Sequence, residues 1–518
     1  MDALMTYPEI KEHLTLRDKV GQLFMAAAFI NDTEAEIKKL EQLIQNHCIG
    51  ALCFFHSRAS AATNFEGTKE IAYQANTYKR LKQLVKRYQK VAKTPLLMAM
   101  DAEWGLAMRV ENTPQYPYAI TLGAAVHEKN LIHEVGRNIA MDCLQAGIHW
   151  NLAPVIDINS NPNNPVIGYR SFGDKKELIT VAATEYINGM SANGILNCIK
   201  HFPGHGDTEV DSHLSLPLIN RTKLELFNNE LHPFKALINY GVDAVMIGHL
   251  MVPALSKNKS MPATVSVDII QGILRQKLGF SGLIISDALN MRAVSTLYTK
   301  KGMLELRAFE AGNDMLCFSE HIVAGISAIL KHGEVNSIEQ SFQRIWRLKE
   351  KAFRNDRPKI LNTPYHDLIP KLAKQSLTLL TGTETIIKDF RKNNYRTLAF
   401  GKKEDTTFLD SLTASPIGQN DDSILIALYP PCAKPMDYFG MDLAELRHIN
   451  QLLQSKKVVL YVFGNPYILK HLAYHKSLAT VLAYQDFKPF QQHAAEHFLG
   501  KHIARGKLPV TIPNPNHG

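Results

Sequence analysis

The sequence predicts an α/β protein in which a (β/α)8 TIM-type barrel precedes a smaller α/β sandwich domain with an open, largely parallel sheet. Two observations predict this fold class. Short apolar runs alternate with amphipathic stretches along the chain, and this alternation is typical of βα units. The runs are apolar at nearly every position, as expected for parallel strands that are covered on both faces.

The first eight apolar runs predict the strands of the barrel. Runs of this length, bounded by polar or turn residues, indicate buried strands. Eight successive βα units are typical of a closed barrel. The runs are QLFMAAAF (22–29), GALCFF (50–55), PLLMAM (95–100), HWNLAPVID (149–157), ILNCIK (195–200), DAVMIGHL (243–250), LIISDAL (283–289) and DMLCFS (314–319).

The pattern changes after the eighth unit. The stretch KAFRNDRPKILNTPYHDLIP (351–370) is charged and contains prolines, which indicates a linker. We predict a catalytic barrel domain over 1–352, a linker over 353–372 and a C-terminal α/β domain over 373–518. The apolar runs of the second domain are LTLLT (377–381), TLAF (397–400), SILIALY (423–429), KVVLYVFG (457–464) and ATVLAY (479–484).

Composition excludes several classes of protein. The 518 residues are 45% hydrophobic and 21% charged, which is the profile of a globular protein and not of a disordered one. The net charge is +9, but no run of five or six basic residues occurs, so we expect no nucleic-acid partner. The polar, acid-containing start of the chain and the short apolar stretch VGQLFMAAAFI indicate no membrane segment. We therefore expect a cytoplasmic monomer.

The six cysteines are far apart, and most lie inside apolar runs. No CxxC pair occurs, so neither a redox motif nor a disulfide framework is indicated. The spacing predicts buried thiols in a reducing compartment.

Ionisable residues follow six of the eight predicted barrel strands. The carboxyl ends of barrel strands meet at one mouth, where active sites form. One polar strand end is ordinary, but six of eight favour a catalytic cleft. In chain order these residues are Asp101 and Glu103, Asp157, Lys200 and His201, His249, Asp287 and Glu320.

Two further features have more than one interpretation. Asp287, in LIISDALNM, is either the N-cap of a following helix or a carboxylate nucleophile that faces the barrel mouth. Arg170, in NPVIGYRSFG, together with Arg109 and Lys200, supplies donors for the hydroxyl or carboxylate groups of a ligand, although each alone is also typical of a protein surface.

The loop KHFPGHGDTEVDSH (200–213) has three interpretations. It lacks the Walker pattern, so a phosphate loop is not indicated. A polar turn is one alternative. A metal site is another, because the loop contains His201, His205, Asp207, Asp211 and His213, but structural zinc spacing and a helical HExxH are absent. The third is acid–base chemistry, in which Asp211 orients the imidazole of His213 and raises its basicity.

The same segments resemble family 3 glycoside hydrolases, specifically their bacterial β-N-acetylglucosaminidase branch. KHFPGHGDTEVDSH resembles the signature loop of that branch, NPVIGYRSFG and SDALNM also match, and GKLPVTIP resembles the closing strand of the family's second domain. The resemblance covers nearly the whole chain. It implies a retaining exo-β-N-acetylglucosaminidase that removes terminal non-reducing GlcNAc from muropeptides in peptidoglycan recycling or from chitooligosaccharides.

The resemblance also implies a role for each matching residue. Asp287 occupies the nucleophile position, and His213, paired with Asp211, occupies the acid/base position. No metal and no other cofactor are implied; the partner is a carbohydrate substrate. The positions expected to bind the terminal sugar are Asp101, Arg109, Arg170, Lys200, His201 and His249.

One segment departs from the family pattern. The family commonly shows DQEGG-R-V-Q-R where this chain has DAEWGLAMR (101–109). The acids, the glycine and the final arginine are retained, so we expect the change to affect the leaving-group side of the pocket. Three alternatives stay open: a GlcNAc glycoside phosphorylase, a metal-dependent barrel hydrolase, and a sugar-binding protein with a degenerate site.

Overall fold

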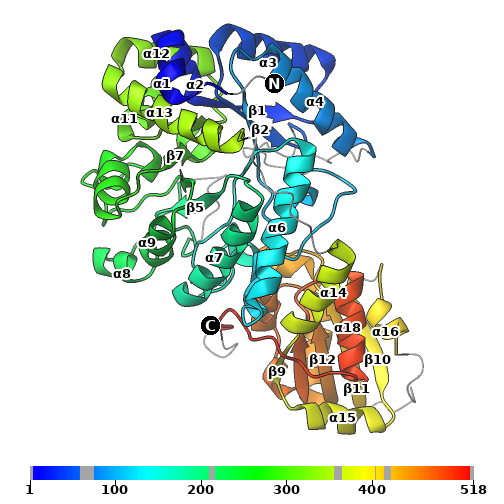
Figure 1. The fold of residues 1–518 in the computed structure, drawn as a ribbon. Coiled ribbons are helices and arrows are strands. Elements are labelled where there is room, and N and C mark those ends of the chain that lie inside the picture. Colours follow the sequence, from blue (N-terminus) through cyan, green and yellow to red (C-terminus); the bar gives the residue numbers. More distant parts are fainter. Residues whose placement is uncertain are drawn as a thin grey trace. The chain divides into compact units, whose positions relative to one another are not determined.

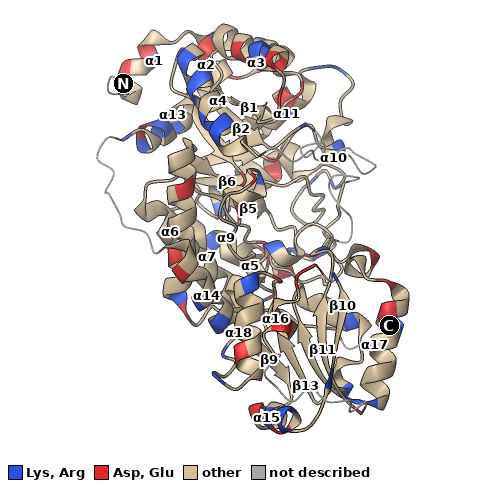
Figure 2. Ribbon diagram, turned by 90° about the vertical axis from the view of Figure 1, so that its right-hand side faces the viewer, with Lys and Arg blue, Asp and Glu red and all other residues tan. Residues whose placement is uncertain are grey.

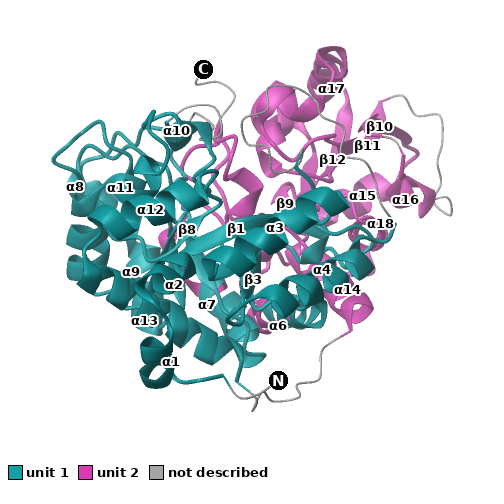
Figure 3. Cartoon of the chain, turned by 90° about the horizontal axis from the view of Figure 1, so that it is seen from above, with its two compact units in different colours: residues 1–116, 135–157, 183–362 teal, residues 117–134, 158–182, 363–518 magenta. Residues whose placement is uncertain are grey.

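The computed structural model describes residues 4–58, 75–208, 216–354, 364–402, 404–412 and 422–513. The chain divides into two compact units (Figure 3). Unit 1 comprises Met1–Tyr116, Val135–Asp157 and Ala183–Asn362. Unit 2 comprises Pro117–Glu134, Ile158–Ala182 and Thr363–Gly518. The segments 117–134 and 158–182, which lie within the range predicted for the barrel, therefore group with the second unit.

Unit 1 contains two parallel sheets (Figure 1), with the strand orders β4-β3-β2-β1-β8 and β5-β6-β7. Each of the eight strands overlaps one of the eight predicted runs. Isolated bridges join Trp150 to Leu196, Val155 to Lys200, and Ile285 to Met315. The strands are β1 Phe24–Phe29, β2 Ala51–Phe55, β3 Leu97–Met100, β4 Trp150–Asn151, β5 Cys198–Phe202, β6 Ala244–Ile247, β7 Leu283–Ser286 and β8 Leu316–Cys317.

Helices follow most of these strands, as the amphipathic stretches predict. Helices α6 and α7 contain residues of both units. The helices that carry unit 1 residues are α1 Tyr7–His13, α2 Leu16–Gln22, α3 Glu34–His47, α4 Thr77–Val91, α6 Lys129–Ala146, α7 Lys176–Ala192, α8 Lys223–Asn228, α9 Leu231–Tyr240, the π-helix η4 Asp268–Lys277, α10 Arg292–Ser295, α11 Met303–Ala311, α12 Ile322–His332 and α13 Val335–Ala352.

Local sequence determines where several of these helices begin. In α3, the backbone N–H of Thr33 donates to Glu36 Oε2 at 2.9 Å, and the N–H of Glu36 donates to the Thr33 hydroxyl at 3.4 Å. This reciprocal capping box satisfies two backbone donors at the start of a helix. The same arrangement begins α2 at Thr15 and α8 at Thr222.

Unit 2 is built on one sheet with the strand order β10-β11-β12-β13-β9. Neighbouring strands are parallel except β9, which runs antiparallel to β13. The strands are β9 Thr378–Thr381, β10 Arg396–Gly401, β11 Ser423–Tyr429, β12 Lys457–Val462 and β13 Ala479–Leu482. The main helices are α5 Ala119–Ala124, α14 Tyr365–Ser376, α15 Glu384–Lys392, α16 Thr407–Asp410, α17 Leu443–Ser455 and α18 Lys488–Phe498.

Both faces of the unit 2 sheet are covered, which explains its nearly continuous apolar runs. In β11, Ile424, Ile426 and Leu428 belong to one hydrophobic cluster. Leu425 and Ala427 alternate with them and belong to a second cluster on the other face. Successive side chains of a strand point to opposite faces, so a strand buried on both sides shows no polar alternation.

The second half of the predicted linker is a helix in the structure. Residues 365–372 belong to α14, whose Leu368, Ile369 and Leu372 are buried. Residues 355–363 lie outside the described residues. Among the described residues, no helix combines the length and the apolar composition needed to cross a lipid bilayer. Figure 2 shows basic and acidic residues interspersed along the helices, as the scattered charges of the sequence predict.

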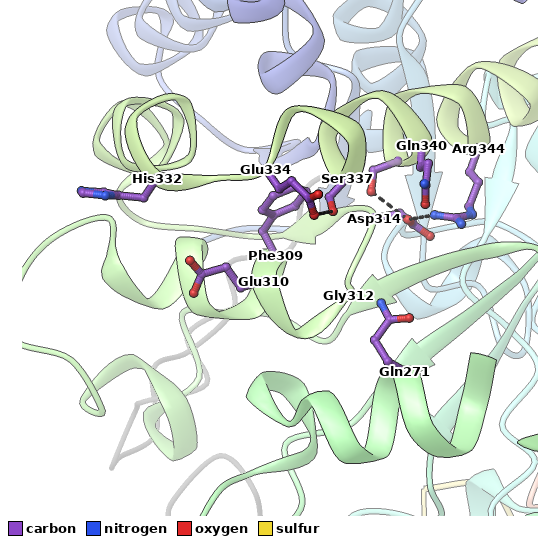
Figure 4. Close-up of a pocket in the computed structure, with 11 residues that line it drawn as sticks. Gln271, Phe309, Glu310, Gly312, Asp314, His332, Glu334, Ser337, Gln340 and Arg344 are labelled. Atoms are coloured by element: carbon purple, nitrogen blue, oxygen red, sulfur yellow. Dashed lines mark hydrogen bonds and ion pairs between the residues drawn. The ribbon is translucent and has the colours of Figure 1, made fainter. Parts of the chain in front are cut away.

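A polar pocket of about 220 Å³ lies at the amino ends of β7 and β8 (Figure 4). Its most buried charge is Asp314, whose side chain is 1% exposed. Asp314 contacts Arg275 at 2.5 Å and Arg344 at 2.8 Å, and it accepts hydrogen bonds from the Ser341 hydroxyl and the backbone N–H of Ile284. These four contacts balance the charge of Asp314 within the protein. We therefore assign this pocket a structural role.

Replacing Asp314 with Asn should destabilise unit 1 by about 3 kcal/mol, because two arginines would lose the buried charge that balances them. Urea unfolding followed by tryptophan fluorescence measures this, since Trp104, Trp150 and Trp346, the three tryptophans of the chain, all belong to unit 1. Glu310→Gln is the control: its partner Arg307 is half exposed, so the change should stay below about 1 kcal/mol. Equal effects of the two substitutions would contradict the assignment.

Candidate active site

Four strands of unit 1 place ionisable residues at their carboxyl ends. Asp101 directly follows β3, and Lys200 and His201 lie within the last three residues of β5. His249 lies two residues beyond β6, and Asp287 directly follows β7. The strands β5, β6 and β7 are parallel neighbours, with Phe202 opposite Ile247 and Ile247 opposite Ser286. Their carboxyl ends therefore lie at the same edge.

Lys200 is the centre of a buried charge cluster. Its ammonium nitrogen lies 2.8 Å from Asp101 Oδ1 and 2.8 Å from Glu103 Oε1. The other oxygen of Asp101 accepts a hydrogen bond from Arg109 Nη2 at 2.9 Å. The lysine side chain is only 2% exposed. The guanidinium of Arg109 also lies over the ring of Phe55, 5.4 Å from its centroid.

These cations determine the protonation state of Asp101. Burial alone would raise the pKa of its carboxyl group, but the charges and hydrogen bonds of Lys200 and Arg109 outweigh burial and hold the pKa well below its usual range. Asp101 is therefore an anion at neutral pH. An ionised carboxylate accepts hydrogen bonds from hydroxyl groups of a ligand, and the lysine and the arginine beside it donate them.

A second buried group is centred on Asp157, which follows β4. Its Oδ2 lies 2.7 Å from His201 Nδ1, and its oxygens also accept hydrogen bonds from the backbone N–H groups of His201 and His205. Burial alone would raise the pKa of Asp157, but the nearby His201 and His205 lower it. The carboxylate therefore orients the His201 ring and holds the ring proton on Nδ1, which faces Asp157.

His249 is held as a neutral ring in a defined tautomer. Its Nε2 lies 2.9 Å from the carbonyl oxygen of Ala288, and its Nδ1 lies 2.6 Å from the Thr264 hydroxyl. A carbonyl only accepts hydrogen bonds, so the ring proton is assigned to Nε2, and Nδ1 accepts from Thr264. Burial lowers the pKa of His249, which keeps the ring uncharged at neutral pH.

Asp287 combines partial exposure with an ionised carboxyl group. Burial would raise its pKa, but His249, His201, the backbone N–H of Ala288 and Lys200 together lower it. The N–H of Ala288 donates to Asp287 Oδ1 at 2.7 Å. The helix-cap interpretation of Asp287 is wrong, because the next helix, α10, begins at Arg292 and its N-cap residue is Met291. The carboxylate is thus available for chemistry at the strand end.

The described residues of unit 1 do not include every predicted site residue. Asp211 and His213 lie in 209–215, outside the described residues. Arg170 belongs to unit 2, where it ends the short helix η2, Gly168–Arg170, and its Nη1 donates to the carbonyl oxygen of Val166 at 3.2 Å. Glu320 is exposed and lines a separate cavity of about 690 Å³. Unit 1 therefore brings together Asp101, Arg109, Lys200, His201, His249 and Asp287.

The described part of the 200–213 loop does not favour a metal site. His201 contacts Asp157, and His205 Nδ1 lies 2.9 Å from the Thr208 hydroxyl. Asp207 forms a bidentate ion pair with Arg221, at 2.6 and 2.9 Å. Among the described residues, no three potential metal ligands of this loop lie close enough to one another to share an ion.

Three partners of the site residues were not given roles by the sequence. Glu103 and Asp157 were recognised as strand-end acids, but their contacts with Lys200 and His201 depend on the order and register of the strands. Thr264, which fixes the tautomer of His249, lies 15 residues further along the chain in η3, Ala263–Val265. No sequence pattern indicates that contact.

Comparison with known proteins gives consistent matches. Residues 15–348 match the model of the glycosyl hydrolase family 3 N-terminal domain. A protein named beta-hexosaminidase A, from Pseudoalteromonas piscicida, is 30% identical over 341 residues, which cover 60% of this chain and 55% of that protein. A beta-hexosaminidase from Psychromonas ingrahamii is 34% identical over 256 residues, which cover 48% of this chain and 73% of that protein. The chain thus spans only about half the length of the first of these relatives.

Among solved structures, a glycoside hydrolase family 3 beta-N-acetylglucosaminidase from Paenibacillus sp. aligns with a TM-score of 0.77 at 26% sequence identity. The alignment covers 96% of this chain and 99% of that one, so it includes both units.

His205 should make stability depend on pH. Burial, with a smaller contribution from His201, lowers its pKa to about 4, whereas an unfolded histidine titrates near about 6.5. Between these values the unfolded chain binds a proton that the folded chain excludes, so stability falls as pH decreases from 6.5 to 4. The loss from this residue should reach about 3 kcal/mol.

Urea unfolding at a series of pH values tests this prediction. His205→Asn, which can still contact Thr208, should reduce the loss of stability below pH 6.5. His332→Asn, at an exposed position of the same unit, is the control and should leave the slope unchanged. Parallel pH curves for wild type and His205→Asn would disprove the prediction.

Proposed function

The chain belongs to glycosyl hydrolase family 3, and from this membership we propose that it is a retaining exo-β-N-acetylglucosaminidase. It would hydrolyse terminal, non-reducing, β-linked GlcNAc. The main support from the structure is the carboxylate of Asp287, which lies at a strand end and whose pKa is lowered by His249, His201, Ala288 N–H and Lys200 against the effect of burial. A carboxylate in this state is suited to nucleophilic attack.

The proposed mechanism has two steps. Asp287 attacks the anomeric carbon and forms a covalent glycosyl-enzyme, while His213, oriented by Asp211, protonates the leaving oxygen. His213 then removes a proton from the incoming water, which releases the sugar with its original anomeric configuration. The roles of His213 and Asp211 rest on the resemblance of their loop to the family signature.

Substrate binding is assigned to the charge cluster and the two oriented histidines. The Asp101 carboxylate accepts hydrogen bonds from sugar hydroxyls, and Lys200 and Arg109 donate them. His201 and His249 present rings whose orientation is fixed by Asp157 and by Thr264. For Arg170, the sugar-binding role stays a prediction from the sequence.

The proposal also includes the closure of the barrel, the domain boundaries, the substrates and the cellular compartment. The bridges Val155–Lys200 and Ile285–Met315 support closure of the unit 1 strands into a complete barrel. For the domains, we propose a barrel domain over 1–352 and a second domain that begins with α14 at Tyr365. Muropeptides or chitooligosaccharides are the proposed substrates of a cytoplasmic monomer; buried free thiols at Cys48, Cys53, Cys143, Cys198 and Cys317 support a reducing compartment.

The direct test of the function compares a chromogenic β-GlcNAc glycoside with the corresponding β-glucoside. We expect turnover of the first to exceed turnover of the second. Adding inorganic phosphate and measuring sugar 1-phosphate separates hydrolysis from phosphorolysis, since only a phosphorylase forms that product. If sugar 1-phosphate accumulates, the assigned reaction becomes phosphorolysis and not hydrolysis.

Asp287→Ala should reduce kcat at least about a thousandfold, because the covalent step loses its nucleophile. Added azide should partly restore turnover of an activated substrate and give a glycosyl azide of inverted configuration. The control is Asp389→Ala, an exposed position in unit 2, which should leave kcat unchanged. Full activity of Asp287→Ala would disprove the nucleophile assignment.

His213→Ala should lose much more rate on a substrate with a poor leaving group than on one with an activated phenolate, because the phenolate needs little protonation. We expect the two losses to differ at least about tenfold. The ratio of kcat/KM values for the two substrates measures this difference. Equal losses on both substrates would contradict the acid role.

A further inference from the structure

A group of three potential metal ligands lies in unit 2, at the end of helix α18, the red helix of that unit in Figure 1. His493 and Glu496 are three residues apart on this helix, so their side chains lie on the same side of it. His502 follows four residues after the helix ends. One ligand atom of each residue lies within 4.8 Å of the other two.

The contact between His493 and Glu496 is not a satisfied hydrogen bond. His493 Nδ1 lies 2.9 Å from Glu496 Oε2. That nitrogen is buried, and among the described residues it has no hydrogen-bond partner with acceptable geometry. A buried nitrogen without such a partner is costly. A cation held between the imidazole nitrogen and the carboxylate would satisfy both.

His502 has the supporting contact that metal-binding histidines generally have. Its Nε2 lies 3.0 Å from the carbonyl oxygen of His493, and its Nδ1 lies 3.3 Å from the carbonyl oxygen of Ile503. A neutral ring carries one proton, and the shorter contact assigns it to Nε2. The other nitrogen then keeps a lone pair, and the His493 carbonyl orients the ring.

The neighbouring histidine does not compete for this role. His497 is fully buried, and both its ring nitrogens have partners: Nδ1 lies 2.8 Å from the Tyr461 hydroxyl, and Nε2 lies 3.0 Å from Glu384 Oε2.

We propose that His493, Glu496 and His502 form a zinc-binding site in unit 2. Two imidazoles and one carboxylate are a ligand set typical of Zn²⁺, with water in the fourth position. Ligand distances of about 2.0–2.2 Å from the ion require only that the three side chains draw slightly closer together. The bound ion would join α18 to the segment 499–505 that follows it. The sequence did not indicate this site, because the spacing matches no established zinc motif.

The test uses the full chain without an affinity tag, stripped of metal by a chelator. Titration with Zn²⁺ against a chromogenic chelator should give one equivalent with a dissociation constant of about 10 μM or lower. Free Zn²⁺ at about 100 times that constant should raise the unfolding midpoint of unit 2 by about 5 °C. Titration with Co²⁺ should give visible absorption bands of a four- or five-coordinate ion.

Variants locate the site. Glu496→Gln keeps the size of the side chain and should weaken binding at least about tenfold. The His493→Ala/His502→Ala double variant should lose the tight equivalent and the Co²⁺ bands. His366→Ala, at an exposed position of α14 in the same unit, is the control and should bind like wild type. Absence of a tight equivalent in the wild type, or its survival in both Glu496→Gln and the double variant, would overturn the proposal. None of these measurements depends on glycosidase activity.

Discussion

The candidate site depends on the burial of one ammonium group. The side chain of Lys200 is almost fully removed from solvent, and an isolated buried charge costs several kcal/mol. Asp101 and Glu103 supply the balancing carboxylates, and Asp101 in turn holds Arg109. Because Lys200 belongs to β5 and Asp101 follows β3, this balance fixes the ends of two strands from different sheets. His201 lies at the end of β5, and His249 and Asp287 follow β6 and β7, the next two strands of the same sheet.

The site contains two kinds of ionisable group. Asp101, Asp157 and Asp287 are held as anions, because nearby cations, histidines and hydrogen-bond donors outweigh the effect of burial. His205 and His249 are held neutral, because burial opposes their protonation. The mechanism proposed above needs an ionised carboxylate as its nucleophile, and Asp287 is held in that state. The charges are therefore provided by the fold before any substrate arrives.

The strands were predictable from the sequence, whereas the partners of the site residues were not. Strands covered on both faces produce continuous apolar runs in the sequence, and every predicted run overlaps a strand. The contact of Lys200 with Glu103 and that of His201 with Asp157 join residues 97 and 44 positions apart, and only strand order brings them together. The sequence also did not predict that 117–134 belongs to unit 2. Ile120 and Ala124 pack in the same cluster as Ile426, but an apolar helix face does not specify which surface it packs against.

The division of the chain into units has a consequence for how this protein can be shortened. The chain passes from one unit to the other five times, after residues 116, 134, 157, 182 and 362. No single cut therefore separates the two. A fragment that ended before α14 would still contain Ile120 and Ala124 but would lack the strands that cover them. A gene encoding only the first 350 or so codons would therefore specify a polypeptide with an exposed apolar surface and a tendency to aggregate.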